Sequence, residues 1–475
     1  MSAPVDASPA PPWRSLALLA VLAAALRLLF LAVEPPTRPV GDEWTWIGWS
    51  IHSPAGVASP EVRFDPLATG VLFYPPGYPY FVGALYALLG SLGAVKLAQA
   101  LFAALLVPAV GGVAARVAGP GAGKWAGLIV ALYPELIWFS VHFWSETLFL
   151  VLLWWAFERL LAADGRLAPG VNPGVRASGA HATLVTAPPN PRAGGSTAVA
   201  ALAGLLWGLA ILTRETSLYF TPVAALWLAR GRGPGLRRGA AFLVMALLTV
   251  APWTYRNWVK HQAFIPVSTA GGLNLWQGNA PLTRQEVYDR YFAVQGLVAQ
   301  YQAARREGLR AIAARQPLWI FEKLRDEMPR FWEADSLALV HIHRGAYGPR
   351  APAVEALAAL VVLVPFLLVL LLFARGVWCS PLGSGQALLL GFLGYYNLIH
   401  VATHGFARYR LPALPVVMVL AAAALAAWRA RQPCRPGRRR RVVAALVVLT
   451  LAGVVAASLT RWPARLGPGA GEVEE

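Results

Sequence analysis

Residues 15–33 read SLALLAVLAAALRLLFLAV, a run of leucine, alanine and valine with no acidic residue and one arginine, Arg27. At 1.5 Å per residue, a helix of this length can cross the apolar interior of a bilayer, which takes roughly 20 residues. No clear small-x-small cleavage site follows the run. We therefore interpret it as a first membrane span and not as a signal peptide.

The composition extends this interpretation to the whole chain. Of the 475 residues, 57% are hydrophobic and 13% are charged, and the mean hydropathy is +0.52. Soluble domains carry about 25% charged residues. The apolar runs are continuous, whereas the strands of a membrane β-barrel alternate polar and apolar residues. The sequence predicts an all-α polytopic membrane protein, with apolar segments at about 15–33, 77–92, 95–117, 124–141, 147–162, 198–212, 217–230, 240–256, 353–374, 385–402, 411–428 and 442–460.

The basic residues set the expected orientation. The net charge is +18, and many of the arginines cluster in short stretches between apolar runs, such as RGRGPGLRRG (230–239) and RRRR (438–441). Cytoplasmic loops have this character, so nucleic-acid binding is disfavoured. The arginine clusters fall on one side of the membrane if 77–92, which follows the two prolines at 75 and 76, lies in the membrane–water interface and does not span the bilayer. We expect 11 spans, with the N-terminus inside and the C-terminus outside.

This topology predicts two large regions outside the membrane. The first is the loop 34–94, and the second is a helical insertion at 257–352. We expect residues 1–430 to form one functional region and 431–475 to hold a basic cytoplasmic loop, a last span and a tail.

Paired carboxylates follow the first apolar run, in RPVGDEWTW (38–46). Asp42 and Glu43 lie at the outer end of the first predicted span, and Glu146 lies at the outer end of the segment 124–141. A carboxylate that faces a substrate hydroxyl acts as a general base. The alternative is that acids at helix starts stabilise the helix dipole.

Arginine at the outer end of a span is unusual. The stretch ARYRLPALP (407–415) places Arg408 and Arg410 there, on either side of Tyr409. A lipid phosphate would give them a partner, through charge-assisted hydrogen bonds. The alternative is that they anchor the helix among lipid headgroups.

Three further polar positions lie at segment ends. Arg256 is in PWTYRNW. Arg214 and Glu215 lie in LTRE, between two short apolar segments, where an ion pair that holds two helices together is the alternative to a ligand site. Asn274 lies in GGLNLWQGN, a glycine- and asparagine-rich turn that could face a sugar.

Two other site types are disfavoured. GPGAGKW (119–125) has Ala118 and Trp125 where a phosphate-binding loop needs glycine and serine or threonine. His341 and His343 have no acid at a fixed spacing that would complete a metal site.

Taken together, these motifs resemble those of the polyprenyl-phosphate-dependent GT-C glycosyltransferases, which include the protein O-mannosyltransferases and the aminoarabinose transferases. An acid in the first outer loop, PPGYP, SETLF, LTRE, PWTYRNW, GGLNLWQGN and ARYRLPALP occur in that order between about residues 14 and 430. The resemblance implies a GT-C helical bundle of about 11 transmembrane helices in the cytoplasmic membrane of the cell envelope, with its active site facing outward.

The resemblance also implies roles. Asp42 would be the base, with Glu43 as a second candidate, and Glu146 would orient the acceptor or a metal. Arg408 and Arg410, with Tyr409, Arg256 and Arg214, would bind the donor's lipid phosphate.

The resemblance has one departure. The aminoarabinose transferases have a charged stretch before the double proline, and here the sequence reads LFYPP. We therefore predict no metal, leave the cofactor open, and assign Tyr74 and Asn274 to sugar or acceptor contact.

The expected activity is transfer of a hexose or pentose, with inversion, from a polyprenyl phosphate to a hydroxyl or phosphate of a lipid, glycan or protein acceptor. The alternative is a transporter or lipid-linked sugar flippase. Transporters place ionisable residues near the middle of the bilayer and are often built from repeats. Here these residues lie at segment ends, and no repeat is evident.

Overall fold

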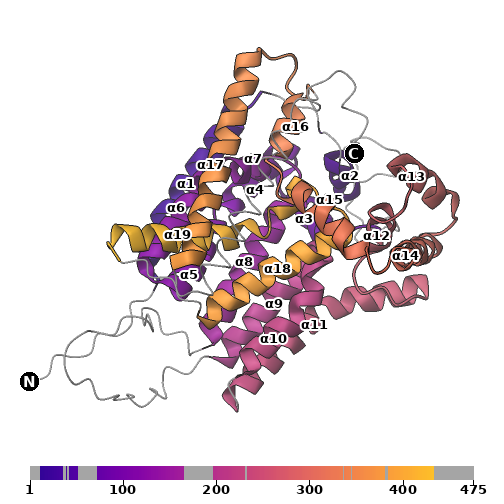
Figure 1. Cartoon of the computed structure of the whole chain (residues 1–475), viewed down its shortest axis with the longest axis horizontal. Helices are drawn as coiled ribbons and strands as arrows, with labels where there is room; N and C mark the ends of the chain where they lie inside the picture. Colours follow the sequence, from indigo (N-terminus) through magenta and orange to yellow (C-terminus); the bar gives the residue numbers. More distant parts are fainter. Residues whose placement is uncertain are drawn as a thin grey trace, which may run out of the picture.

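The computed structural model describes residues 11–35, 39, 42–51, 72–164, 196–230, 233–334, 336–343, 345–379 and 383–432. Over these residues the chain forms helices and no strand, which confirms the all-α fold (Figure 1). The last predicted span, 442–460, and most of the first outer loop lie outside the described residues.

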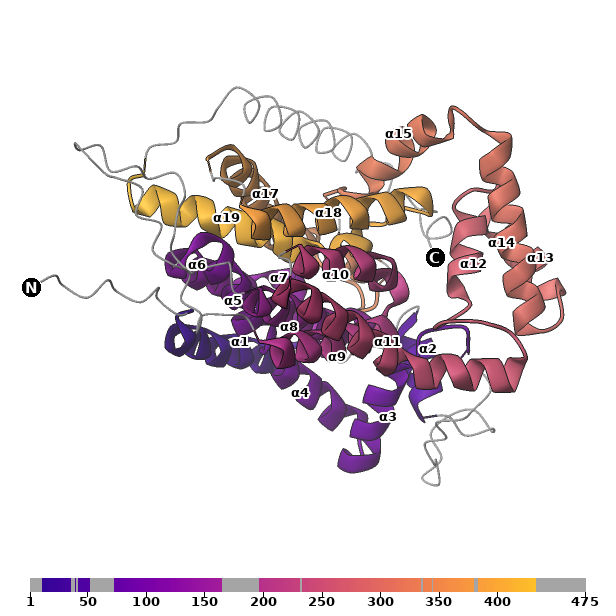
Figure 2. The same cartoon turned by 90° about the horizontal axis from the view of Figure 1, so that it is seen from below.

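The membrane-type helices come from both ends of the chain, and Figure 2 shows many of them running side by side. The N-terminal group consists of α1 (Trp13–Val33), α2 (Asp42–Ile51), α3 (Gly77–Leu89), α4 (Leu92–Ala103), α5 (Leu106–Ala118), α6 (Pro120–Leu132), α7 (Pro134–Val141), α8 (Ser145–Ala163), α9 (Thr197–Thr213), the 3₁₀ helix η2 (Glu215–Phe220), α10 (Thr221–Ala229) and α11 (Pro234–His261). The C-terminal group consists of α17 (Pro352–Cys379), α18 (Ser384–Ala402), the 3₁₀ helix η3 (Ala407–Arg410) and α19 (Leu414–Arg429).

A second group of shorter helices occupies the predicted insertion 257–352. It comprises α12 (Ala270–Gln277), α13 (Arg284–Ala293), α14 (Leu297–Ala314), α15 (Trp319–Phe331) and α16 (Leu337–His343). The expected helical character of this region is confirmed. Helices α12, α13 and α14 stand together at one end of the molecule, beyond the end of α18 and next to the end of α11 (Figure 2).

Length and apolar character identify four described helices that can cross a membrane: Trp13–Val33, Leu92–Ala118, Pro234–His261 and Pro352–Cys379. A fifth arises if α6 and α7 form one span bent by 54°. The bend falls at Tyr133, just before Pro134, where proline disfavours a continuous helix. The chain is therefore a multi-pass membrane protein, while the number of about 11 stays a prediction. Several predicted spans, such as α9 and α19, form helices shorter than 18 residues.

Close helix packing builds the centre of the bundle. Helix α9 presents Gly204 and Gly208 to α11, and a Cβ atom at Gly204 would lie 2.3 Å from the carbonyl oxygen of Phe242. Small residues four apart allow helices in a membrane to approach this closely. Trp207, between the two glycines, is fully buried and its Nε1–H donates to Thr221 Oγ1 at 3.0 Å. This packing fixes the end of α9, and with it Arg214.

Candidate active site

A cavity of about 1230 Å³ lies where the bundle meets the shorter helices. Its walls come from the start of α2, the segment before α3, the start of α8, η2, the helices α12–α16, the end of α18 and η3. Most of the predicted site residues lie on or directly behind these walls, although they are up to 367 positions apart in the chain. The sequence-predicted residues that line it are Asp42, Tyr74, Arg214, Asn274, Arg408 and Tyr409.

Asp42 and Arg408 face each other across this cavity. Asp42 is the first residue of α2, and its Oδ2 lies 2.9 Å from Nη2 of Arg408 in η3. Both side chains are partly exposed, at 34% and 23%. The arginine also stacks over Trp144, with its guanidinium 5.1 Å from the ring centroid, and donates to the Tyr409 hydroxyl at 3.2 Å. The two ends of the predicted site are thus in direct contact.

Glu43 points away from the cavity. Its side chain is 2% exposed, and Oε1 accepts the backbone N–H of Phe143 at 2.9 Å. Its Oε2 lies 3.8 Å from Nε2 of His341. Glu43 therefore ties α2 to the turn before α8, and of the two adjacent acids Asp42 is the one that reaches the cavity.

Glu146 lies behind the cavity wall. It is buried at the start of α8, where its Oε1 lies 2.7 Å from Nη1 of Arg214. Arg214 lines the cavity and also donates to Ser145 Oγ at 3.1 Å. In this arrangement Glu146 positions Arg214, and its expected role of orienting the acceptor or a metal stays a prediction. This ion pair joins the end of α9 to the start of α8, which is the alternative role that the sequence left open for Arg214.

We expect Glu146→Ala to destabilise the protein by about 1–3 kcal/mol, because it leaves the largely buried guanidinium of Arg214 without its carboxylate. Thermal unfolding of the detergent-purified protein measures this change. The double variant Glu146→Leu with Arg214→Met removes both charges, so it should recover much of the lost stability while remaining inactive. A double variant no more stable than Glu146→Ala would show that the ion pair does not cause the loss.

Two predicted phosphate ligands lie elsewhere. Arg410 is 1% exposed, donates to the Glu333 carbonyl oxygen, and lies 4.2 Å from the ring centroid of Phe366. Arg256 lies on α11, 4.5 Å from the ring centroid of Trp253. Neither lines the cavity. Arg408 and Arg410 point in different directions because they are two positions apart on a 3₁₀ helix, which has about three residues per turn.

The two predicted sugar contacts do line the cavity. Asn274 lies on α12, and Tyr74 packs against Trp46 with ring centroids 4.8 Å apart. Burial, and then the carboxylate of Asp42, raise the pKa of Tyr74 above its ordinary value. Tyr74 is thus a neutral phenol near the Asp42–Arg408 pair and can donate a hydrogen bond to a ligand.

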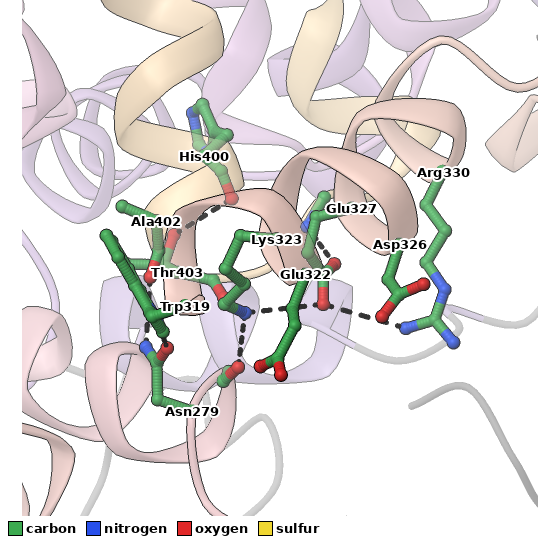
Figure 3. A network of polar contacts seen from close by, with 12 residues as sticks. Asn279, Trp319, Glu322, Lys323, Asp326, Glu327, Arg330, His400, Ala402 and Thr403 are labelled. Atoms are coloured by element: carbon green, nitrogen blue, oxygen red, sulfur yellow. Dashed lines mark hydrogen bonds and ion pairs between the residues drawn. The ribbon is translucent and has the colours of Figure 1, made fainter. Parts of the chain in front are cut away.

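A buried polar network holds the segment before Arg408 in place (Figure 3). Lys323 of α15 donates to the Thr403 carbonyl oxygen at 2.8 Å and to the Gly278 carbonyl oxygen. Glu327, one turn further on, accepts the backbone N–H of Gly405 at 2.8 Å. At Gly278 a Cβ atom would lie only 1.9 Å from the Thr403 carbonyl oxygen, so only glycine fits there. Sequence analysis missed this clamp, although the i,i+4 spacing of Lys323 and Glu327 is a usable signal.

Glu215 is a further cavity residue to which the sequence analysis gave no site role. Its Oε2 accepts the Ser268 hydroxyl at 3.0 Å, and the backbone N–H groups of Ser268 and Gly271 contribute further hydrogen bonds. Burial raises the pKa of the Glu215 carboxyl from its ordinary 4.5 to about 7, against the effect of these hydrogen bonds. The cavity therefore holds a carboxyl group that titrates near neutral pH.

The shift in Glu215 predicts a pH dependence of stability. The unfolded chain loses this proton near pH 4.5 and the folded chain near 7, so the group disfavours the folded state increasingly across that window, by about 3 kcal/mol above it. Glu215→Gln should be more stable than the parent at pH 8, with a smaller advantage at pH 5. Thermal unfolding at both pH values measures this, and Glu307→Gln, an exposed α14 variant, is the control. An equal advantage at both pH values would contradict the assignment.

Within the described part of the chain, no group of three or more histidine, cysteine, aspartate or glutamate side chains is arranged to hold a metal ion. His341 packs edge-on against Trp138, and its Nδ1 lies 2.9 Å from the Leu337 carbonyl oxygen. His343 contacts the Leu339 carbonyl oxygen in the same way, at 2.7 Å.

The described helices define a class, that of multi-pass membrane proteins whose helical bundle meets a group of shorter helices at a large cavity. Among solved structures, the chain is similar to the oligosaccharyltransferase AglB of Archaeoglobus fulgidus in complex with an inhibitory peptide and a dolichol-phosphate, at a TM-score of 0.50 and 15% identity over 93% of this chain and 54% of that one. A crystal structure of the A. fulgidus oligosaccharyltransferase with Zn and sulfate gives a TM-score of 0.48 at 15% identity, over 94% of this chain and 52% of that one.

A third similar structure is ArnT of Cupriavidus metallidurans bound to undecaprenyl phosphate, with a TM-score of 0.38 and 16% identity over 86% of this chain and 76% of that one. Of the three, the first alone reaches a TM-score of 0.5, and at this identity it shows a shared fold. The chain spans about half the length of the two oligosaccharyltransferase chains. No protein-family model and no curated protein matches the sequence. The GT-C fold expected from the motifs is thus confirmed.

Proposed function

We propose that this protein is an integral-membrane glycosyltransferase. It transfers a hexose or pentose from a polyprenyl-phosphate donor to a hydroxyl or phosphate of a lipid, glycan or protein acceptor. The observation that carries the proposal is the Asp42–Arg408 ion pair of 2.9 Å on the wall of a large cavity in a GT-C fold. A base for the acceptor and a cation for the leaving phosphate are the two groups that this reaction needs.

The proposed step is a single displacement with inversion. Asp42 takes the proton of the acceptor hydroxyl while the acceptor oxygen bonds to the anomeric carbon of the sugar. The bond between that carbon and the phosphate oxygen breaks, and its electron pair leaves on the lipid phosphate. Arg408, with Arg214 beside it, stabilises the negative charge that develops there, because fixed cations in a preorganised site favour the transition state.

The ion pair gives the step an order. Arg408 contacts Asp42 at 2.9 Å, so the arginine that would bind the donor phosphate also holds the proposed base. A donor phosphate that engages Arg408 weakens this contact and releases Asp42 for the acceptor. Glu146 acts as a positioning residue, since it holds Arg214 at 2.7 Å from behind the wall.

Two further features support the proposal. AglB, whose fold this chain shares, was solved with a dolichol-phosphate, a lipid phosphate of the proposed donor class. The site residues also lie at helix ends and on 3₁₀ turns, where the polar ends of a lipid-linked donor are accessible. We place the site on the outer face of the cytoplasmic membrane, with residues 1–430 as the functional region and 257–352 as its outer insertion.

Mass spectrometry of envelope lipids and glycans from a deletion strain tests the proposal. We expect one class of acceptor to lose the mass of a single sugar, and a plasmid copy of the wild-type gene to restore it. A transporter or flippase would leave unmodified donor on the wrong side of the membrane and would not itself form the covalent product. An unchanged acceptor population in the deletion strain would contradict the proposal.

A further inference from the structure

Among the residues that the structure describes, the walls of the cavity carry more arginine than acid. The arginines are Arg214, Arg284, Arg305, Arg330 and Arg408, and the carboxylates are Asp42, Glu215 and Glu333. Arg408 and Arg214 are each held by a carboxylate within 3 Å, as described above. Arg284, Arg305 and Arg330 lie on the helices α13, α14 and α15 of the insertion, so the excess positive charge is on that wall.

Arg284 is the clearest of the three. Its Nη2 donates to the Tyr288 hydroxyl at 3.0 Å, and its guanidinium lies 5.3 Å from the centroid of the same ring. Its Nε is buried and makes no hydrogen bond within the described part of the chain, and no described carboxylate pairs with the guanidinium. A buried donor without an acceptor costs about 1–3 kcal/mol. Because Arg284 lines the cavity, an oxyanion bound there would give its guanidinium an acceptor and a charge partner.

The neighbouring His404 lies close to two of these arginines, Arg408 and Arg284. It lines the cavity, and its ring lies 4.9 Å from that of Phe406. Burial, followed by the charges of Arg408 and Arg284, lowers the pKa of His404 to about 3. The imidazole is therefore neutral at physiological pH, so the positive charge on this wall comes from the arginines.

The two sets of cations differ in their place in the fold. Arg408 and Arg214 lie at the ends of bundle helices, where a phosphate attached to a membrane lipid must stay. Arg284 begins α13, which stands with α12 and α14 at the end of the molecule beyond the bundle (Figure 2). A ligand that enters from the aqueous side meets this wall first.

We propose that the acceptor is an anionic molecule, with a phosphate or carboxylate near the hydroxyl that receives the sugar, and that Arg284 binds this oxyanion. The inference rests on the proposed function and names the substrate class of the same cavity. Arg284 thereby sets acceptor specificity, while Arg408 serves the donor.

The test uses the full-length protein in nanodiscs and two probes. Undecaprenyl phosphate reports the donor site by native mass spectrometry. Glycerol 3-phosphate, with neutral glycerol as its matched control, reports the acceptor site by intrinsic tryptophan fluorescence at saturating undecaprenyl phosphate. We expect Arg284→Gln to weaken the binding of glycerol 3-phosphate by about tenfold. Arg284→Lys should weaken this binding less, and neither substitution should change the binding of undecaprenyl phosphate. Arg290→Gln, an exposed arginine on the same helix, is the control.

The other outcomes of this test contradict either the inference about Arg284 or the proposed function. Equal binding of glycerol and glycerol 3-phosphate to the parent protein would overturn the inference, as would an Arg284→Gln variant that binds glycerol 3-phosphate normally. If Arg284→Gln weakens the binding of undecaprenyl phosphate and leaves the binding of glycerol 3-phosphate unchanged, Arg284 belongs to the donor site and the inference is wrong. Failure of the parent protein to bind undecaprenyl phosphate would instead overturn the proposed function, and it is seen in a separate measurement.

Discussion

Asp42→Asn is expected to lower sugar transfer by about 10²–10⁴-fold, the usual contribution of a general base. The amide has the shape of the carboxylate but cannot take a proton from the acceptor. Because the variant also frees Arg408 from its ion pair, undecaprenyl phosphate should bind as tightly as in the parent, or more tightly. Transfer is measured by recovery of the sugar-modified acceptor in the deletion strain, and binding is measured on the purified protein.

Two controls separate the role of Asp42 from general effects. Asp289→Asn changes an exposed acid on α13 and should leave transfer unchanged. Glu43→Gln changes the buried neighbour, which accepts the Phe143 N–H at 2.9 Å, so it should lower thermal stability more than transfer per folded molecule. Near-normal transfer by Asp42→Asn would remove Asp42 from the mechanism.

Arg408→Gln is expected to weaken donor binding as well as transfer, whereas Asp42→Asn lowers transfer and keeps donor binding. Losing this cation should weaken the binding of undecaprenyl phosphate by at least about tenfold. It should also lower the rate of sugar transfer by about 10²–10³-fold, as expected for the loss of one group that stabilises charge in the transition state. The neighbouring Arg410→Gln is the matched control. Arg410 is buried against the Glu333 carbonyl oxygen and Phe366, so its loss should lower thermal stability without changing lipid-phosphate affinity. An equal loss of undecaprenyl phosphate affinity in Arg408→Gln and Arg410→Gln would mean that both substitutions disrupt the whole segment, and it would remove the specific role of Arg408.

The sequence predicted the parts of the fold that depend on local pattern. Long apolar runs such as 15–33 and 353–374 form helices of membrane-spanning length, and the polar insertion forms helices. The charge-based topology also placed Asp42 and Arg408 on the same side of the membrane, and the family resemblance assigned them to one site. The sequence could not predict their contact distance, since that depends on how helices far apart in the chain pack.

The features that the sequence did not predict all involve the direction of a side chain. The RYR stretch does not tell which arginine faces a cavity, and the answer came from the 3₁₀ geometry of residues 407–410. Glu146 seemed accessible at a helix start but pairs with Arg214, which is 68 positions away. The clamp formed by Lys323 joins three segments that are distant in sequence.

The most direct test of the central claim is a transfer assay in proteoliposomes. Purified protein is incubated with sugar-linked undecaprenyl phosphates and an envelope extract from the deletion strain, and the products are measured by mass spectrometry. The account predicts equal amounts of released undecaprenyl phosphate and sugar-modified acceptor, both lost with Asp42→Asn. Movement of intact donor across the bilayer, with no released undecaprenyl phosphate, would contradict it and establish a transporter.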